Sequence, residues 1–203
     1  MTFNIEQADQ LLSTTRAVRQ RLDLDREVSD QILFDCIELG EQAPSGGNIT
    51  SRRWIVIKDL EIKAKLADLY RSAGGSDIIE RANREQVSGS SNAGVSRSAA
   101  YLAQNMEKVP ALVLLTILGK HDGSGRPGLF DSVIQAGWSF CLALRARGLG
   151  SAWTTMHLGK VNEIGALLGI PNEVTQVVLL PVAWTKGSEF RAAPRKPVPE
   201  ITW

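Results

Sequence analysis

Three short segments, far apart in the chain, carry residues that could hold an anionic and planar ligand. They are residues 15–19 (TRAVR), 43–48 (APSGGN) and 194–197 (PRKP). Guanidinium groups in the first and last segments could bind a phosphate through paired hydrogen bonds. The middle segment offers backbone N–H groups, and Asn48 adds an amide that both donates and accepts hydrogen bonds. Together the segments favour a divided site for a negatively charged, planar cofactor.

Each segment taken alone has a simpler interpretation. Arg16 and Arg19 could form a solvated basic turn after a helix, and residues 44–47 (PSGG) are ordinary turn formers. Arg195 lies between two prolines and could be an exposed tail residue. It is their joint occurrence, in this order, that favours a common site.

The sequence offers little for metal or nucleophilic chemistry. It has two histidines and two cysteines, and neither histidine has a second His, Cys or carboxylate at a metal-ligand spacing. We therefore expect no metal and assign no catalytic side chain. His157 is expected to be capped or solvated rather than a proton donor. Cys36 and Cys141 are expected to be buried apolar residues in a reducing compartment.

Two glycine-containing segments do not fit nucleotide-binding loops. Residues 148–153 (GLGSAW) lack a third glycine and follow a predicted helix instead of a strand, which argues against a dinucleotide-binding loop. Gly119-Lys120 is followed by His121, where a phosphate-binding loop needs Ser or Thr.

Composition favours one domain over residues 1–203. The 23 basic and 22 acidic residues nearly balance, which argues against nucleic acid or an anionic membrane as a partner. The first ten residues (MTFNIEQADQ) lack a signal-peptide pattern, and no apolar run approaches the roughly 20 residues of a membrane span. We expect a cytoplasmic protein.

Apolar periodicity predicts the elements that must position these residues. Strands are predicted at 54–57, 111–118 and 174–184, and the second is expected to be buried on both faces. Helices are predicted at 4–14, 30–41 (capped by Ser29), 62–70, from about 95 onwards, 129–147 and 161–168. In the fourth helix, Val95, Ala99, Leu102 and Met106 are predicted to share one face. The helix at 129–147 is apolar nearly all round, which predicts a central or interface position.

Two segments are predicted to lie outside the packed core. Residues 72–94 are rich in Gly and Ser, which favours a mobile excursion that is either a lid or a segment without a role. The proline-rich residues 185–203 favour an extended arm. The sum is an α+β domain with about four strands, long buried helices and an extended tail.

The chain resembles the nitroreductase family of FMN-dependent oxidoreductases from Thr15 to Pro197, most weakly over 72–94. Members typically carry an Arg/Ser/Arg-type cluster, a Pro-Ser-x-x-Asn loop before a strand, a Gly-Leu-Gly-Ser segment after a long helix, and an Arg-x-Pro near the end. The matching residues here are 16–19, 44–48, 148–151 and 195–197.

The resemblance implies a nitroreductase-like α+β fold with a central, mainly antiparallel sheet flanked by helices. It implies an interwoven homodimer with an extended C-terminal arm and two FMN sites at the interface. Arg16 and Arg195 would hold the FMN phosphate, and Arg19 would lie near the pyrimidine edge of the ring.

The other implied cofactor contacts come from three segments. Ala17 and Val18 belong to the first cluster. The ring would be lined from the partner subunit by Pro44, Ser45, Gly46 and Asn48. The stretch Trp153, Thr154 and Thr155 would lie along the flavin, with backbone N–H groups near its reactive nitrogen.

The activity implied by the resemblance is a ping-pong reaction. NADPH or NADH would reduce FMN and leave, and a small-molecule electron acceptor (a nitroaromatic, a quinone or an activated alkene) would then enter the same pocket. Alternatives are a flavoprotein of the same fold that performs dehalogenation, flavin destruction or azoline oxidation, and a non-catalytic binding domain.

The chain departs from the family pattern where substrate would bind. Many members follow the loop Asn with Gln-Pro-Trp, whereas this chain has Thr50, Ser51 and Arg52, and Ala17 stands where Ser is usual. We hypothesise that Thr50 and Arg52 contact substrate, with Arg52 or Arg53 adding positive charge at the pocket mouth. An outward-facing arginine on a strand edge is the alternative.

Overall fold

A four-stranded sheet forms the centre of the computed structural model, which describes residues 2–49, 51–120 and 128–202. The strand order is β1-β2-β4-β3, and each neighbouring pair is antiparallel. The strands are β1 (Arg52–Ile57), β2 (Ala111–Leu118), β3 (Leu149–Ser151) and β4 (Val174–Trp184). The predicted bounds of β2 and β4 are confirmed to the residue, and β1 begins two residues earlier than predicted.

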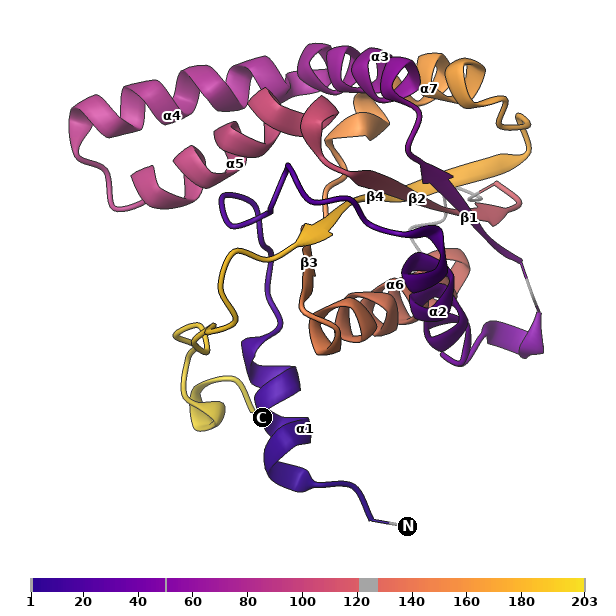
Figure 1. Cartoon of the computed structure of the whole chain (residues 1–203), viewed down its shortest axis with the longest axis vertical. Helices are drawn as coiled ribbons and strands as arrows, with labels where there is room; N and C mark the ends of the chain where they lie inside the picture. The colour runs from indigo at the N-terminus through magenta and orange to yellow at the C-terminus, as the bar shows by residue number, and fades with distance from the viewer. Residues whose placement is uncertain (1, 50, 121–127, 203) are drawn as a thin grey trace.

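Helices cover both faces of the sheet (Figure 1). On one face lie α2 (Asp30–Glu41) and α6 (Gly128–Ala146), which pack against each other. On the other face lie α3 (Leu60–Tyr70), α7 (Val161–Leu168) and the C-terminal half of α5 (Ala93–Asn105). Helix α1 (Ile5–Thr14) projects away from the sheet and contacts α6. The α+β class and the antiparallel sheet flanked by helices are therefore confirmed.

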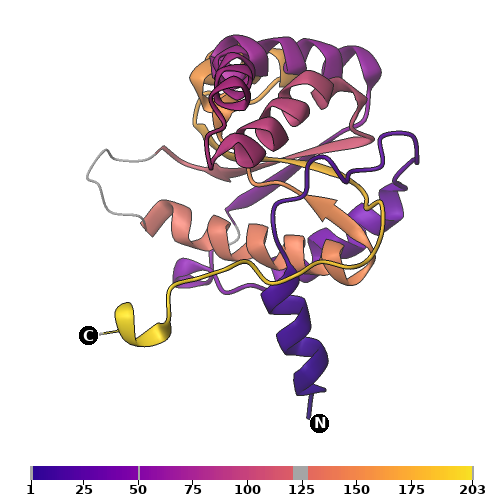
Figure 2. The same ribbon diagram turned by 90° about the vertical axis from the view of Figure 1, so that its left-hand side faces the viewer.

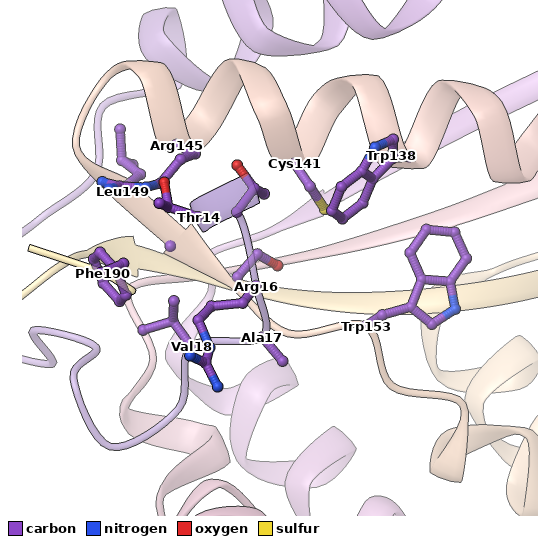
Figure 3. A pocket seen from close by; sticks show the side chains of 13 residues that line it. Thr14, Arg16, Ala17, Val18, Trp138, Cys141, Arg145, Leu149, Trp153 and Phe190 are labelled. Atoms are coloured by element: carbon purple, nitrogen blue, oxygen red, sulfur yellow. The ribbon is translucent and has the colours of Figure 1, made fainter. Parts of the chain in front are cut away.

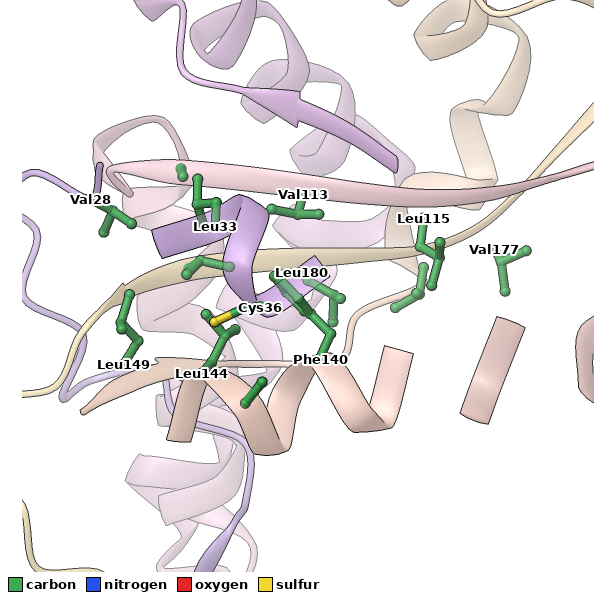
Figure 4. Packing of buried hydrophobic residues seen from close by; sticks show 14 of the residues in the cluster. Val28, Leu33, Cys36, Val113, Leu115, Phe140, Leu144, Leu149, Val177 and Leu180 are labelled. Carbon is green, nitrogen blue, oxygen red and sulfur yellow. The ribbon is translucent and has the colours of Figure 1, made fainter. Parts of the chain in front are cut away.

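Strand β2 is apolar without alternation because each of its faces contacts a different layer of helices. Val113 and Leu115 pack with the α2 and α6 side chains (Figure 4). Leu112 and Leu114 pack with α3 and α5 on the opposite face. All four are fully buried, which confirms the predicted double burial.

The capping signal predicted α2 correctly, whereas the apolar pattern of α6 predicted more burial than the structure has. Helix α2 has the predicted bounds, and the Ser29 hydroxyl accepts a hydrogen bond from the Ile32 N–H (3.4 Å). Helix α6 is not buried all round, because Ile134 and Trp138 remain 47% and 41% exposed. This chain therefore presents apolar surface on the helix that was predicted to be central or at an interface.

Residues 72–94 form packed helical structure instead of an irregular excursion. A kinked turn (Arg71–Gly75), in which Gly74 has a non-helical φ of +127°, leads into α4 (Ser76–Ser88), which pairs with α5 in a hairpin that extends beyond the sheet (Figure 1). The polar sequence is helical because Ala82 and the half-buried Ile79 pack inward while charged pairs such as Arg84–Glu80 (3.8 Å) lie outside. Whether the hairpin moves as a lid stays a prediction.

Of the four residues predicted to share one face of α5, Leu102 and Met106 are buried as predicted, Ala99 is partly buried, and Val95 is exposed. Val95 is 67% exposed, and the residues that pack inward are Ser96, Ala100, Leu102 and Ala103. The buried stripe therefore includes the predicted Leu102 and differs from the prediction at the N-terminal end of α5, where Ser96 is buried instead of Val95.

After β4 the chain has no regular element in residues 188–197 and ends in a short helical turn at Val198–Glu200 (Figure 2). Most of this tail is exposed. None of the helices in the described ranges is both long and apolar enough to cross a membrane.

Candidate functional site

The first predicted segment, residues 15–19, runs beside the edge strand β3. The Val18 N–H donates to the Ser151 carbonyl (2.8 Å). Gly150 permits this approach, because a Cβ there would lie 2.9 Å from the Cβ of Val18. The segment is therefore held against the sheet at the point where β3 leads into Trp153.

Two hollows share this segment. The first, of about 290 Å³, is largely apolar and includes Trp138, Cys141 and Trp153 (Figure 3). The second, of about 400 Å³, is lined by residues 16–21 together with Ser98 and residues 189–191. Arg16, Ala17 and Val18 line both hollows, as does Phe190. An apolar hollow thus adjoins one rich in arginine.

Phe190 is fixed between two guanidinium groups. The Arg21 guanidinium lies 4.0 Å from the ring centroid and that of Arg145 lies 4.5 Å away. Arg21 also donates to the carbonyls of Lys186 (2.9 Å) and Glu189 (2.7 Å). These contacts hold the start of the tail on the hollows, where the Arg16 guanidinium donates to the Arg191 carbonyl (3.1 Å).

Four arginines (Arg16, Arg19, Arg21 and Arg191) and one carboxylate residue (Glu189) line the second hollow, which leaves an excess of positive charge. Within the described residues, no ion pair joins Arg16, Arg19 or Arg21 to a carboxylate. Burial lowers the pKa of the Arg19 guanidinium, and Tyr70 partly opposes this effect. Burial also lowers the pKa of Arg145, and the nearby charge of Arg21 adds to the decrease. The arrangement can bind an anion, because an anion would relieve this repulsion.

Sequence reasoning missed Arg21, Arg145, Phe190 and Arg191. Phe190 is an aromatic residue at the start of a proline-rich tail, which was the one available signal. Nothing in the spacing connects Arg21 with a ring 169 positions later, because that contact depends on the path of the tail after β4.

The predicted flavin segment after β3 is partly arranged as expected. The Trp153 indole faces the first hollow (Figure 3). The Thr154 N–H, however, already donates to the Leu179 carbonyl (3.1 Å), and its carbonyl accepts from the Leu179 N–H (2.9 Å). The Thr154 N–H is therefore already bonded within the sheet, and a backbone contact from this stretch to a flavin stays a prediction for Trp153 and Thr155. The Thr154 hydroxyl lies 2.8 Å from the Tyr70 hydroxyl, and Thr155 is exposed.

The second predicted segment lies at the opposite edge of the sheet. The loop at residues 43–48 precedes β1, whereas the hollows adjoin β3, three strand spacings or about 14 Å away. The loop is fixed to the beginning of α6, where the Gly46 N–H donates to the Ser132 hydroxyl (2.9 Å). Pro44, Ser45, Gly46 and Asn48 therefore line neither hollow within one chain.

The third segment also stays apart from the hollows. Arg195 is exposed, its guanidinium donates to the neighbouring Pro194 carbonyl (3.3 Å), and it lines neither hollow. Within one chain the tail contributes Phe190 and Arg191 instead.

Arg52 is a structural residue, which corrects the expectation that it stands at a pocket mouth. It is only 6% exposed and its Nε lies 3.2 Å from a carboxylate oxygen of Glu41. The guanidinium also donates to the carbonyls of Ala43 and Ser132 (both 3.2 Å). It thus holds the end of α2 against α6. Thr50, the other predicted substrate contact, lies outside the described residues.

The sequence also predicted the surroundings of His157, Cys36 and Cys141. His157 is fully buried, and neither ring nitrogen has a hydrogen-bond partner among the described residues, so the expected capping or solvation is wrong. Burial lowers its pKa to about 4. Cys36 is buried as predicted, whereas Cys141 is partly exposed to the first hollow. Burial raises the pKa of the Cys141 thiol to about 12, so the thiol stays protonated.

Solved structures share this fold. A BluB-like flavoprotein from Clostridium difficile 630 has a TM-score of 0.70 and 21% identity over 100% of this chain and 99% of its own. An iodotyrosine deiodinase bound to FMN and 3-iodo-L-tyrosine has a TM-score of 0.70 and 19% identity, covering 93% and 94%. The FMN and NADPH-dependent nitroreductase NfnB from Sphigopyxis sp. strain HMH has a TM-score of 0.70 and 18% identity, covering 96% and 97%.

No curated protein sequence matches the chain. The model of the nitroreductase family matches residues 12–184. This range contains the sheet, both layers of helices and most residues of the two hollows. The chain therefore belongs to the nitroreductase family.

Proposed function

We propose that this protein is an FMN-dependent oxidoreductase that transfers electrons from NADPH or NADH to a small acceptor such as a nitroaromatic or a quinone. The observation that carries the proposal is the arginine-lined hollow beside an apolar, indole-lined one in a chain of this family. When bound, FMN would supply the electron exchange with both substrates in turn. The chain's own residues would bind, orient and shield it.

The residues around the hollows fit the chemistry of FMN. A phosphate monoester carries nearly two negative charges, which suits the guanidinium groups of Arg16, Arg19 and Arg191 in the second hollow. A planar ring suits the hollow bounded by Trp138 and Trp153. The two hollows meet at the residue 16–18 segment, so one ligand can reach both.

We assign the phosphate to Arg16 and the pyrimidine edge of the ring to Arg19. Ala17, Val18 and the segment Trp153–Thr155 would lie along the ring. Arg195 is kept as a second phosphate ligand that the tail would supply, with Arg191 already beside Arg16. No side chain is assigned a catalytic proton transfer.

We further propose that the site is completed by a second copy of this chain. Helices α2 and α6 expose Phe34, Ile134 and Trp138, which are 54%, 47% and 41% exposed. A partner packed on these helices would cover apolar surface. It could also bring its Pro44–Asn48 loop to the hollow that this chain's own loop does not reach, so the FMN site would lie at the interface of a homodimer.

The experiment is FMN binding to the purified chain, followed by turnover. The expected result is stoichiometric uptake of yellow FMN, bleaching by NADPH or NADH without oxygen, and recolouring by a nitroaromatic or a quinone. Recolouring by a halogenated aromatic alone, with release of halide, would replace the proposed reaction by dehalogenation. A chain that takes up no FMN would overturn the proposal.

A further inference from the structure

A third hollow, which the proposed function does not use, lies between α7 and the start of β4 (Figure 1). Its volume of about 510 Å³ is that of a small-molecule site. Gln176 of β4 lines it, whereas Val182 of the same strand pairs with Ser151 of β3, beside the first two hollows. A strand rises about 3.3 Å per residue, so positions 176 and 182 are roughly 20 Å apart. The third hollow is therefore a separate feature.

A β-bulge in β4 aims the Gln176 side chain at this hollow. Leu115 of β2 pairs with Val178, whereas the next residue of β2 pairs with Gln176. Val177 is therefore an extra residue in β4. On a regular strand Gln176 would share a face with Val178 and point into the α2–α6 layer. The bulge instead puts Val177 and Val178 together in that layer and turns Gln176 toward α7.

The Gln176 amide is bonded at its nitrogen only. Its Nε2 donates to the Val161 carbonyl at the start of α7 (2.8 Å). The residue is only 5% exposed, and its Oε1 accepts no hydrogen bond from any of the described residues. Buried polar atoms almost always have a partner, because an unpaired one has lost its hydrogen bond to water and gained none. The oxygen therefore needs a donor, and the hollow that Gln176 lines is the space from which a donor can approach.

The other walls of the hollow combine apolar surface with one cation. The apolar lining comes from α7, the turn after it and the start of β4: Val161, Ala166, Ile170, Pro171 and Val174. Among the described residues that line the hollow, Lys120 is the only charged one. Its ammonium group favours an anion nearby. The amides of Asn162 and Asn172 lie on the exposed rim.

We propose that the third hollow binds a small organic anion whose apolar body carries a hydroxyl or N–H donor. The donor bonds to Gln176 Oε1, and the anionic group lies toward Lys120. The apolar body packs on Ile170 and Pro171, which removes apolar surface from water. This site does not depend on FMN, so the inference stands or falls separately from the proposed function.

The test is residue-resolved NMR of the full chain with three probes at millimolar concentration. 4-Hydroxybenzoate carries both the donor and the carboxylate, benzoate lacks the hydroxyl, and phenol lacks the carboxylate. We expect 4-hydroxybenzoate to shift the side-chain amide signals of Gln176 and the backbone amide signal of Gly165, which also lines the hollow. It should bind about three- to tenfold more tightly than benzoate, because the hydroxyl adds one hydrogen bond.

Two variants test the unpartnered oxygen. Gln176→Leu removes it at similar size and should bind 4-hydroxybenzoate and benzoate equally. Ala166→Trp keeps the test decisive if Gln176→Leu does not fold, because it fills the hollow from an exposed position of α7 and should abolish binding of all three probes. A preference for 4-hydroxybenzoate over benzoate that survives in Gln176→Leu would overturn the inference.

A matched pair of lysine variants tests the anion. Lys120→Met should remove the preference for 4-hydroxybenzoate over phenol. Lys108→Met changes an exposed lysine that does not line the hollow, and it should leave this preference intact. If water alone satisfies the Gln176 oxygen, none of the probes shifts its signals, and the inference is overturned. Shifts confined to residues of the first two hollows would overturn it as well.

Discussion

The Trp153 indole packs directly on Gly137 of α6, so that a Cβ at Gly137 would lie 2.8 Å from the indole Cζ3. The glycine thereby gives the wall of the first hollow its position. Leu115 of β2 closes the same space, 3.3 Å from that Cβ position. The hollow therefore depends on a contact between a helix, a strand and the segment after β3.

The first prediction is that Gly137→Ala displaces the Trp153 ring. Overpacking should lower the free energy of unfolding by about 1–3 kcal/mol and weaken FMN binding. Gly94→Ala is the control, because no atom lies within 4 Å of a Cβ there and it lies in α5. The control should stabilise the chain by up to about 1 kcal/mol. Urea unfolding and FMN titration would measure both, and equal FMN affinities would contradict the prediction.

The second prediction concerns the phosphate. Arg16→Ala should weaken FMN binding by roughly ten- to a hundredfold, because a charge-assisted hydrogen bond contributes about 1.5–3 kcal/mol. Arg16→Lys should recover part of this loss, since it keeps the charge without the planar fork. Riboflavin, which lacks the phosphate, should bind Arg16→Ala and the wild type alike. An equal loss for riboflavin would show that Arg16 does not contact the phosphate.

The third prediction separates Arg52 from substrate binding. Arg52→Ala removes one partner of a largely buried ion pair, and we expect the free energy of unfolding to fall by about 3 kcal/mol. Glu41 is one-third exposed, which places the expected loss at the lower end of the range for buried pairs. Lys65→Ala breaks the exposed Lys65–Glu61 pair and should leave the free energy of unfolding nearly unchanged.

Acceptor kinetics complete the Arg52 test. In the folded, FMN-loaded Arg52→Ala chain, the KM values for charged and neutral acceptors should change by the same factor. A selective rise for anionic acceptors would restore the hypothesis that Arg52 faces the pocket mouth.

The fourth prediction follows from the burial of His157. Its pKa is about 4 in the folded chain against 6.5 for the free side chain, so the folded state favours the neutral ring. The unfolded chain takes up the proton first as the pH falls. The stability that this residue contributes is therefore complete above pH 6.5 and declines as the pH falls toward 4, by about 3 kcal/mol in total.

Urea unfolding between pH 7.5 and pH 5 would measure this decline, and His157→Leu should flatten it. If the His157→Leu variant loses stability over this pH range as steeply as the wild type, the decline does not come from protonation of His157.

The fifth prediction tests the second copy. Ile134→Glu places a charge on the exposed apolar surface of α6 without touching either hollow. We expect it to convert a dimer to a monomer in light scattering and to weaken FMN binding, because the partner's loop would be lost. Leu60→Glu, on a residue of α3 that is more exposed than Ile134 (75% against 47%), should change neither. A monomeric wild type with full FMN affinity would contradict the proposed interface.

Local signals were sufficient for the principal elements. Residues 111–118 form an apolar run between Pro110 and Gly119, and Ser29 begins α2 as a cap, so the sequence predicted β2 and α2 with their bounds. Helix α4 was missed although Glu80–Arg84 and Arg81–Glu85 have the spacing of helical ion pairs. Helix α4 has too few apolar residues to give a helical periodicity, and packing on α5 stabilises it.

The sequence by itself determined the family pattern, the class of fold and the cluster at residues 16–19, because these depend on short-range spacing and on apolar runs. Only the tertiary structure decided which cations converge. Arg52 is buried and forms an ion pair with Glu41. Arg21 and Arg145 instead contact the Phe190 ring beside the hollows. Such contacts join positions up to 169 residues apart. They depend on strand order and on the path of the tail, which no local periodicity encodes.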